Sequence, residues 1–449
     1  MSKRSTRLEL FQNIFEDNGI SSDSIELNDA LIKDIQKYAD AVHDYRHPSY
    51  VKHKLSDIIM IVFFATLSNA DEWAEIESFA KKKEAWLRRY LELPYGIPTD
   101  DTYRIVIGNI NVEHFFRITV QLLTDTVDRI LSISGNEDDI HEKSVLSVDG
   151  KVSCGSARKE TRDGEVKALQ TLNIYSADYG ICLDQKFIGE KTNEIPAAQE
   201  MLRLMDLENT IVTADAMNCQ KDTVKVIAQG KGDYVLALKG NQPLFYEEVK
   251  RYFDGKCLEG IKKKENCYKK TIEPEHGGSV TREYYITEDT SWYSEKKEWK
   301  NLCSFGMVHK TLKKLDGSCS KEDRYYICSI KADADEFERA ARGHWGVENN
   351  LHWQMDFTFR DDKNKSMAKT GAKNLQIMKK IAMSILRLVK ESYKISMKRI
   401  RYELSLDFEN EIERMLSMLN IDSRECKIKC VSSLRDSLCT LFLCKSAVD

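Results

Sequence analysis

The hydrophobic pattern of this chain changes at Ser144, and that change most restricts the folds it can adopt. Before it, residues 41–135 repeat apolar side chains at helical spacing, behind a helical lead-in over residues 1–40. After it, short apolar runs bounded by turn residues alternate with amphipathic helices. The runs that predict strands are 145–148, 169–176, 181–188, 211–214 and 234–238. Three strands followed by alternating helices and strands predict a mixed α/β sheet with flanking helices.

Residues 255–325 interrupt this alternation. They are rich in Thr, Tyr, Trp and Lys, and short strands are predicted at 281–286, 302–308 and 325–330. From Asp335 to about Glu391 the pattern is helical again. We therefore expect a β-rich insertion within the α/β core. The expected division is a lead-in over 1–40, a helical domain over 41–135, a core made of 144–254 and 326–400, an insertion over 255–325 and a helical tail over 401–449.

The composition fits a folded chain in a reducing compartment. No segment approaches the roughly 20 uncharged apolar residues that cross a membrane, and the N-terminal sequence lacks the apolar core of a secretory signal. We therefore expect a cytoplasmic protein with no membrane partner. None of the 12 cysteines forms a Cys-x-x-Cys pair, so the last four are expected to be free thiols rather than metal ligands. These are Cys426, Cys430, Cys439 and Cys444.

A basic segment lies near the end of the chain, although the whole chain carries a net charge of -4. Residues 363–401 hold twelve Lys or Arg and one acid, Glu391, which makes the segment net +11. Its apolar residues fall at helical spacing, so we expect one face to pack and the other to be strongly positive. Such a face is typical of proteins that bind polyanions, and we favour DNA over a merely solvated helix. The candidate phosphate contacts here are Lys363, Lys369, Lys373 and Lys380.

Three carboxylates occupy sharply defined positions. Asp149 ends the apolar run 144–148, Asp215 ends the run 210–214, and Glu348 lies in the segment 342–353, which is predicted to be helical. Taken singly, the two aspartates are as well explained as turn or cap residues. However, acidic residues at the carboxyl edges of strands lie where α/β folds bind ligands. Two such acids and one helix acid can converge to hold two hard divalent cations, an arrangement that carries out phosphoryl transfer.

The predicted Glu348 helix also offers another kind of site. His344, Glu348 and His352 are spaced i, i+4 and i+8, and two of them could bind zinc with ligands from elsewhere. All three together span about 12 Å along the helix axis, too far for one tetrahedral ion. Trp345 and Trp353 flank Glu348 and are expected to be core anchors. The sequence contains no phosphate-loop pattern, so no nucleotide cofactor is expected.

Several long motifs, taken in order, resemble one known family. They are 147–151 (SVDGK), 213–216 (TADA), 233–243 (DYVLALKGNQP) and 342–353 (RGHWGVENNLHW), with 96–102 (GIPTDDT) before them and 359–362 (FRDD) after them. This set resembles the ISAs-type, or H-repeat-associated, insertion-sequence transposases, which belong to the DDE group. The likeness covers residues 40–390, and the number and order of its motifs make it specific.

The resemblance implies an RNase H-like catalytic core in which Asp149, Asp215 and Glu348 bind two Mg²⁺ ions, for which Mn²⁺ can substitute. It implies cleavage of double-stranded DNA at terminal inverted repeats and strand transfer into target DNA. Because two DNA ends are cut together, a homodimer on DNA is the expected assembly. The candidates for phosphate contacts nearest these carboxylates are Lys151, Lys239, Arg342 and His344.

The chain departs from the family pattern at two positions. Cys154 and Gly278 stand where the family usually has arginine. Without these guanidiniums the protein has two fewer candidate phosphate contacts, while the carboxylates are untouched. Two alternatives therefore stay open: an RNase H-like nuclease that cleaves without strand transfer, and a DNA-binding transposase derivative without catalysis.

Overall fold

The computed structural model describes residues 23–134, 143–157, 167–189, 193–275, 278–363 and 369–421. The chain divides into two compact units, which we call the helical unit (residues 1–135 and 357–427) and the sheet unit (residues 136–356 and 428–449). The four tail cysteines lie outside the described residues. No helix among those residues is long and apolar enough to cross a membrane.

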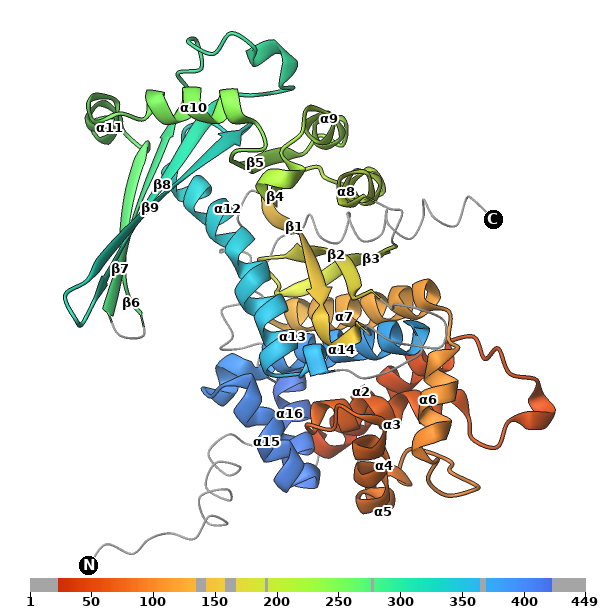
Figure 1. The fold of residues 1–449 in the computed structure, drawn as a ribbon. Coiled ribbons are helices and arrows are strands. Elements are labelled where there is room, and N and C mark those ends of the chain that lie inside the picture. The colour runs from red at the N-terminus through yellow and green to blue at the C-terminus, as the bar shows by residue number, and fades with distance from the viewer. Residues whose placement is uncertain are drawn as a thin grey trace, which may run out of the picture. The chain divides into compact units, whose positions relative to one another are not determined.

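The sheet unit is built on nine strands in the order β3-β2-β1-β4-β5-β9-β8-β7-β6 (Figure 1). The first five are β1 (Ser144–Ser153), β2 (Leu169–Ser176), β3 (Ile181–Ile188), β4 (Thr210–Ala214) and β5 (Asp233–Leu238). β1, β2 and β3 form an antiparallel meander, while β4 pairs parallel with both β1 and β5. This is the RNase H-like arrangement, and the expected mixed α/β fold is confirmed.

The strands β2 to β5 lie close to their predicted positions because their apolar runs are bounded by clear turn signals. β1 continues five residues beyond the predicted run 145–148, because its second half pairs with β2. β4 is buried along its whole length, as expected for a central strand with both faces covered. The turn between β2 and β3 ends at Gly180, whose φ of +70° is a left-handed backbone that favours glycine.

The insertion continues the same sheet. Its strands are β6 (Tyr268–Glu275), β7 (Gly278–Thr287), β8 (Ser304–Lys314) and β9 (Cys319–Cys328). β9 pairs antiparallel with β5, and β8, β7 and β6 follow outward in antiparallel order. The sequence had suggested shorter strands, because the half of β9 that begins at Cys319 is polar and exposed. The helices α10 (Pro243–Tyr252) and α11 (Gly255–Lys262) lead into these strands, and α11 lies within the insertion that was expected to be β-rich.

Helix α12 (Ala334–Gly346) joins the insertion to the rest of the sheet. It packs against β1, β4 and β5 as well as β6 and β7 (Figure 1). Phe337, Ala340 and Ala341 of α12 are buried in one apolar cluster with Ile211 of β4 and Tyr284 of β7. Because both parts of the sheet share this core, the insertion folds as an extension of the sheet.

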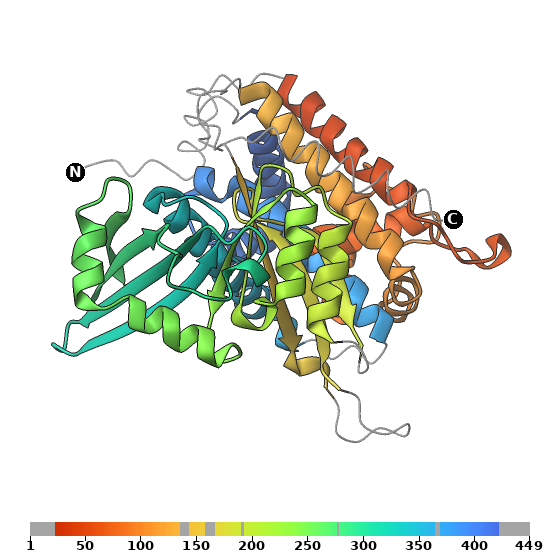
Figure 2. The same ribbon diagram turned by 90° about the horizontal axis from the view of Figure 1, so that it is seen from above.

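Two shorter helices, α8 (Glu194–Arg203) and α9 (Lys221–Gln229), lie side by side in the sheet unit (Figure 2). α8 packs against β2 and β3, and α9 packs against β5. α8 begins after Asn193, whose side-chain oxygen accepts a hydrogen bond from the Ile195 N–H at 3.3 Å. This cap fixes where the helix starts, and therefore the position of Glu194, the first helical residue.

The helical unit contains both N-terminal and C-terminal helices. Its elements are α2 (Asp23–Asp40), α3 (Leu55–Leu67), α4 (Trp73–Lys82), α5 (Glu84–Leu87), α6 (Asp100–Gly108), α7 (Val112–Ser134), α14 (Lys369–Tyr393), α15 (Met397–Leu406) and α16 (Phe408–Ile421). α3 is buried on all sides and packs against α14, which also contacts α6 and α7. The expected division placed residues up to 400 in the catalytic core. The contacts instead group α14 with the N-terminal helices.

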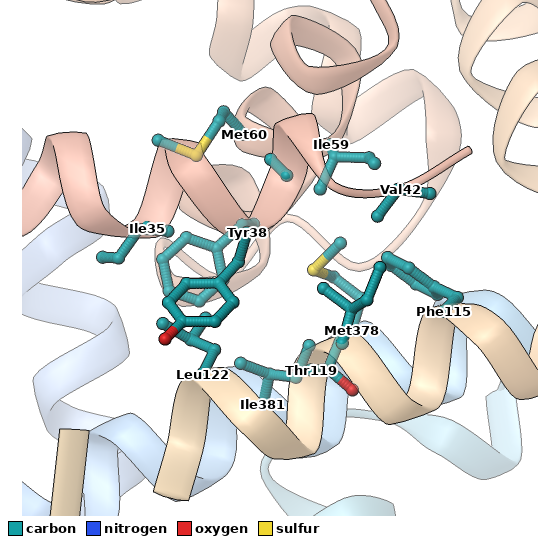
Figure 3. A pocket seen from close by; sticks show the side chains of 13 residues that line it. Ile35, Tyr38, Val42, Ile59, Met60, Phe115, Thr119, Leu122, Met378 and Ile381 are labelled. Atoms are coloured by element: carbon teal, nitrogen blue, oxygen red, sulfur yellow. The ribbon is translucent and has the colours of Figure 1, made fainter. Parts of the chain in front are cut away.

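A small apolar cavity of about 30 Å³ lies between α2, α3, α7 and α14 (Figure 3). Its lining includes Ile35, Ile59, Phe115 and Met378. A void of this size, without several polar partners, is a packing gap rather than a ligand site.

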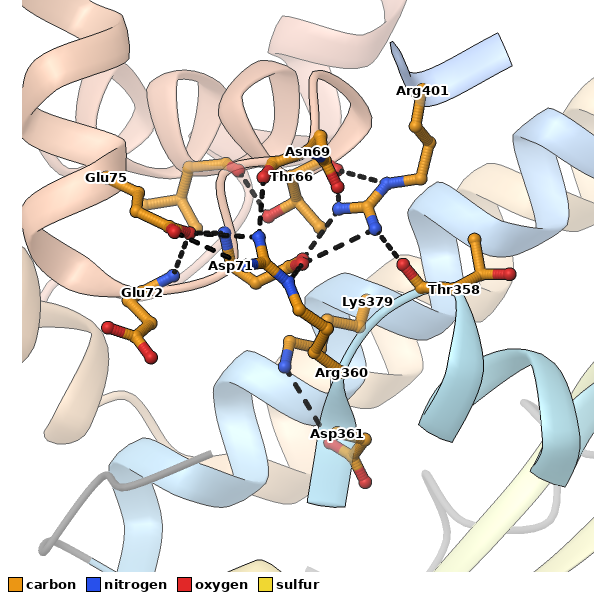
Figure 4. A network of polar contacts seen from close by, with 11 residues as sticks. Thr66, Asn69, Asp71, Glu72, Glu75, Thr358, Arg360, Asp361, Lys379 and Arg401 are labelled. Atoms are coloured by element: carbon orange, nitrogen blue, oxygen red, sulfur yellow. Dashed lines mark hydrogen bonds and ion pairs between the residues drawn. The ribbon is translucent and has the colours of Figure 1, made fainter. Parts of the chain in front are cut away.

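A buried ion cluster fastens the C-terminal helices to the loop after α3 (Figure 4). Arg401 of α15 is fully buried; its Nη2 atom lies 2.6 Å from Asp71 Oδ1 and donates to the Thr66 carbonyl at 2.7 Å. Arg360 also reaches Asp71, with Nε 2.9 Å from Oδ2. Lys379 is buried 4.0 Å from Asp361. Basic residues of the +11 segment are therefore used inside the helical unit, and the expectation of a helix with one open positive face is wrong for Lys379 and Arg401.

Candidate active site

Asp149 and Asp215 stand at neighbouring strand positions. β1 and β4 run parallel with Val148 opposite Ala214, so each aspartate is the next residue along its own strand. β4 ends at Ala214, whereas β1 continues to Ser153 beside β2 alone. The parallel pairing of β1 with β4 therefore ends directly before the two aspartates. The carboxyl edge of parallel strands is where ligands bind in α/β sheets.

Glu348 is brought to the same region by α12. Gly343 allows this helix to lie close to β1, because a Cβ atom at residue 343 would stand 2.7 Å from Cγ1 of Val145. Val145 and Asp149 are four residues apart on a strand and so point to the same face of the sheet. Glu348 follows in a π-helix, Val347–His352, and its side chain is exposed. Single π-helical turns within helices are uncommon and concentrate at functional sites.

The charges of Asp215 and Glu348 both act on Asp149. Burial raises the pKa of Asp149 to about 7, and the charges of Asp215, Glu348 and Glu194 add to this rise. The hydrogen bond from the Gly150 N–H opposes it, with its nitrogen 2.9 Å from Asp149 Oδ1. Burial disfavours the charged form of the carboxyl group, and neighbouring negative charges add to this effect.

His352 lies beside the second oxygen of Asp149. The His352 Nδ1 atom lies 3.5 Å from Asp149 Oδ2. The Asn173 amide nitrogen lies 3.4 Å from the other ring nitrogen, Nε2, and an amide NH₂ group only donates. Nε2 is therefore the acceptor, which places the proton of a neutral ring on Nδ1, facing Asp149. Asn173 itself is the residue opposite Asp149 in the β1–β2 register.

Asp215 is fixed by the turn that follows it. One of its oxygens, Oδ1, accepts hydrogen bonds from the backbone N–H and the side-chain amide of Asn218, both at 3.2 Å. The charge of Asp215 also acts on His344, whose pKa it raises. Burial lowers the pKa of His344 to about 4, although Asp215 opposes this effect, so the ring is neutral at physiological pH.

The donor chemistry of the site fits a hard divalent cation. Carboxylate oxygens are the ligands that Mg²⁺ prefers, and a bound cation offsets repulsion between them. Over the described parts of the chain, no three His, Cys, Asp or Glu side chains already stand close enough to hold one ion. The alternative zinc site, with His344 and His352 as ligands, likewise has no third such side chain close enough among the described residues.

The candidate phosphate contacts near the carboxylates differ in their surroundings. Lys151 is buried and pairs with Asp356. Arg342 Nη1 lies 2.7 Å from Glu273 Oε1. Lys239 is exposed. His344 is buried and neutral, which does not favour a contact with phosphate.

The candidates of the basic segment also differ among themselves. Lys363 is exposed, Lys373 is half-buried and Lys380 is buried. The side chain of Lys369 lies outside the described part of the chain. Lys363 is the most accessible of these candidates whose side chains are described.

The two departures from the family pattern have different structural settings. Cys154 is exposed at the end of β1, where a longer side chain has room to reach solvent. Gly278 begins β7 against the backbone of β8, and a Cβ atom there would stand 2.0 Å from the Lys313 carbonyl oxygen. An arginine at 278 would therefore require the two strands to move apart.

Sequence reasoning missed several residues around the carboxylates. Glu194, Asn218 and His352 adjoin Asp149 or Asp215, and the charge of Glu348 acts on Arg324 of β9. Of the residues around the carboxylates that the sequence analysis did not assign to this site, it named only His352, as a possible zinc ligand. Contacts between segments far apart in the sequence leave no local signal that could have identified the others.

The two tryptophans that flank Glu348 differ in burial. Arg324 lies 4.8 Å from the centre of the Trp345 ring, which partly packs against the core as expected. Trp353 was expected to be a core anchor but is 51% exposed.

Comparison with known proteins agrees with the motifs. Residues 140–385 match the family described as "Transposase DDE domain", and residues 37–123 match "DDE_Tnp_1-associated". YncI of Escherichia coli O157:H7, which carries the name of a transposase, is 33% identical over 388 residues, covering 84% of this chain and 93% of that protein. YhhI of Escherichia coli K12, named as an H repeat-associated transposase, is 30% identical over 359 residues, covering 79% and 90%.

Among solved structures, a piggyBac transposase in a synaptic complex with hairpin DNA matches 91% of this chain and 82% of its own. The TM-score is 0.36 at 11% identity, which is too loose a likeness to define the fold. The sequence relatives and the family match over more than half of the chain are decisive. The chain belongs to the DDE transposase family, a class of DNA-cleaving and strand-transferring enzymes that uses divalent metal ions.

Proposed function

We propose that Asp149, Asp215 and Glu348 are the catalytic carboxylates of this transposase and that together they hold two Mg²⁺ ions, for which Mn²⁺ can substitute. The observation that carries this proposal is the placement of Asp149 and Asp215 directly after the paired residues Val148 and Ala214 of two neighbouring parallel strands. The charges of Asp215 and Glu348 also contribute to the raised pKa of Asp149, behind the effect of burial. Divalent cations bound there would activate the attacking oxygen and stabilise the leaving oxygen of a phosphodiester. Their binding requires the three side chains to rotate toward one another.

The chain's own residues position these carboxylates. His352 Nδ1 lies 3.5 Å from one oxygen of Asp149, and the Gly150 N–H donates to the other. Asn218 holds one oxygen of Asp215 and leaves the second free of that contact. This division of roles keeps one oxygen of Asp215 available for a cation.

Double-stranded DNA is the proposed substrate, first at the terminal repeats of an insertion sequence and then as the target. The exposed Lys239 and Lys363 are the most accessible of the proposed phosphate contacts, because neither is buried or forms an ion pair with another residue that the structure describes. Lys151 and Arg342 already pair with carboxylates and serve first to position their own segments. We further propose a homodimer on DNA, because two ends must be cut together, and a cytoplasmic location.

The test is cleavage of DNA that carries the sequences flanking the coding region, with and without Mg²⁺. Joining of the cut ends to a supercoiled target then separates a transposase from a nuclease that only hydrolyses. A non-catalytic DNA-binding derivative would instead bind the same DNA in EDTA and give no product when Mg²⁺ is added.

A further inference from the structure

A fourth carboxylate lies against the same strand edge. Glu194 is the first residue of α8, and its carboxylate stands over Gly150, the residue next to Asp149. A Cβ atom at residue 150 would lie 2.9 Å from Glu194 Oε2 and 3.0 Å from Oε1. The absence of a side chain at Gly150 is therefore what allows Glu194 to approach the backbone of β1.

Glu194 belongs to the same charge system as the two aspartates. Burial raises the pKa of Glu194, and the charge of Asp215 raises it further. Glu194 in turn contributes to the raised pKa of Asp149. The Asn218 amide acts on both Glu194 and Asp215, since it lowers the pKa of Glu194 and donates to Asp215 Oδ1.

Two buried polar atoms beside this group have no hydrogen-bond partner among the residues that the structure describes. They are Oδ1 of Asn218, whose side chain is 1% exposed, and Nδ1 of His344, which is 8% exposed. An unpaired buried polar atom costs free energy, so a native protein normally supplies a ligand or water for it. Both atoms belong to residues around Asp215, since the Asn218 amide nitrogen donates to Asp215 Oδ1 and the charge of Asp215 acts on His344.

From this geometry we infer that Glu194 is a fourth oxygen ligand of the divalent cations held by Asp149 and Asp215. The inference rests on the proposed function, because it adds a ligand to the same site. The competing explanation is structural: an acid in the first turn of a helix is favoured by the helix dipole. Only the first explanation predicts a change in metal affinity.

The test measures Mn²⁺ binding to the full-length protein by the loss of the free-ion electron paramagnetic resonance signal. Glu194→Gln removes the charge but keeps the shape, and Gly150→Ala displaces the carboxylate without removing it. The matched control is Glu200→Gln on the same helix, whose side chain is 60% exposed and pairs only on the surface with Lys186. Asp149→Asn shows how far Mn²⁺ binding weakens when one of the three proposed metal ligands is lost.

Glu194→Gln and Gly150→Ala should each weaken Mn²⁺ binding about tenfold or more, since even groups that merely support metal ligands contribute on that scale. Glu200→Gln should bind as the unchanged protein does. In the absence of Mn²⁺, Glu194→Gln should melt at the same or a higher temperature, because it removes a charge from a repulsive group. A helix-dipole role predicts a lower melting temperature instead.

The outcomes separate the two proposals. If Asp149→Asn weakens Mn²⁺ binding while Glu194→Gln and Gly150→Ala do not, Glu194 is only a helix-end residue and the proposed function stands. If Asp149→Asn also binds Mn²⁺ like the unchanged protein, the proposed metal site itself is wrong.

Discussion

Lys151 Nζ lies 2.5 Å from Oδ1 of Asp356, and this ion pair joins strand β1 to helix α13 (Trp353–Phe357). The Lys151 side chain is 5% exposed, whereas that of Asp356 is 35% exposed. Lys151 follows Asp149 by two residues on the same face of β1. Asp356 follows the π-helix that carries Glu348. The pair therefore connects the two segments that supply two of the proposed metal ligands.

Asp356→Asn should lower DNA cleavage about tenfold or more, because small displacements of catalytic groups are costly. It should also destabilise the sheet unit by about 2 kcal/mol, below the ~3–5 kcal/mol expected when both partners are fully buried. Reversing the pair, with Lys151→Asp and Asp356→Lys together, should recover much of the loss. If Lys151 acted instead as a phosphate contact, the reversed pair would stay as inactive as the Lys151→Asp single variant in a cleavage assay.

Cys154→Arg should strengthen DNA binding. Cys154 is exposed at the end of β1, so an arginine fits there and adds one cation near the proposed site. The slope of log affinity against log salt should steepen by about 0.9, the value for one additional phosphate contact. Fluorescence anisotropy across a series of KCl concentrations measures this slope. The control is Cys319→Arg, another exposed cysteine on β9; equal slopes for the two variants would show that residue 154 lies away from the DNA.

Arg401→Ala should destabilise the helical unit by about 3–5 kcal/mol, because it removes one partner of a buried ion pair and leaves Asp71 undercompensated (Figure 4). The neighbouring Arg399 is 66% exposed and pairs with Glu403 on the helix surface, so Arg399→Ala should cost about 0–1 kcal/mol. Urea denaturation followed by circular dichroism compares the two. A small effect of Arg401→Ala would mean that the cluster is not what fastens α15.

Much of the fold could be predicted from the sequence where local patterns were strong. The strands β2 to β5 and the first half of β1 are short apolar runs. α6 begins at the cap Thr99, whose hydroxyl accepts from the Thr102 N–H at 3.4 Å. The later strands were harder, because the exposed half of β9 is charged and gains its strand partners only from β8. The prediction that the lysines of α14 form an open positive face was wrong for Lys379 for a similar reason. Lys379 is buried beside Asp361, and no local pattern shows that a lysine will be buried.

In the proposed site, too, the residues in strong local patterns could be predicted, whereas contacts between distant segments could not. Asp149 and Asp215 could be identified because each follows an apolar strand, and Glu348 because it lies in a distinctive motif. The π-helix around Glu348 and the approach of Glu194 to Gly150 depend on packing between segments far apart in the sequence. Such contacts leave no periodicity to detect. The glycine after Asp149 is the one local signal, since glycine in a strand often marks a close approach by another group.

The most direct test of the proposed active site is Mg²⁺-dependent cleavage of DNA that carries the flanking sequences, comparing the unchanged protein with Asp215→Asn. The control is Asp222→Asn, a nearby surface acid on α9 whose side chain is 72% exposed and pairs with Lys225. Asp215→Asn should lower cleavage by about 10³-fold or more, the scale on which single electrostatic groups contribute to catalysis, while still binding DNA. Asp222→Asn should cleave normally. Equal cleavage by Asp215→Asn and the unchanged protein would contradict the assignment of these carboxylates as the catalytic centre.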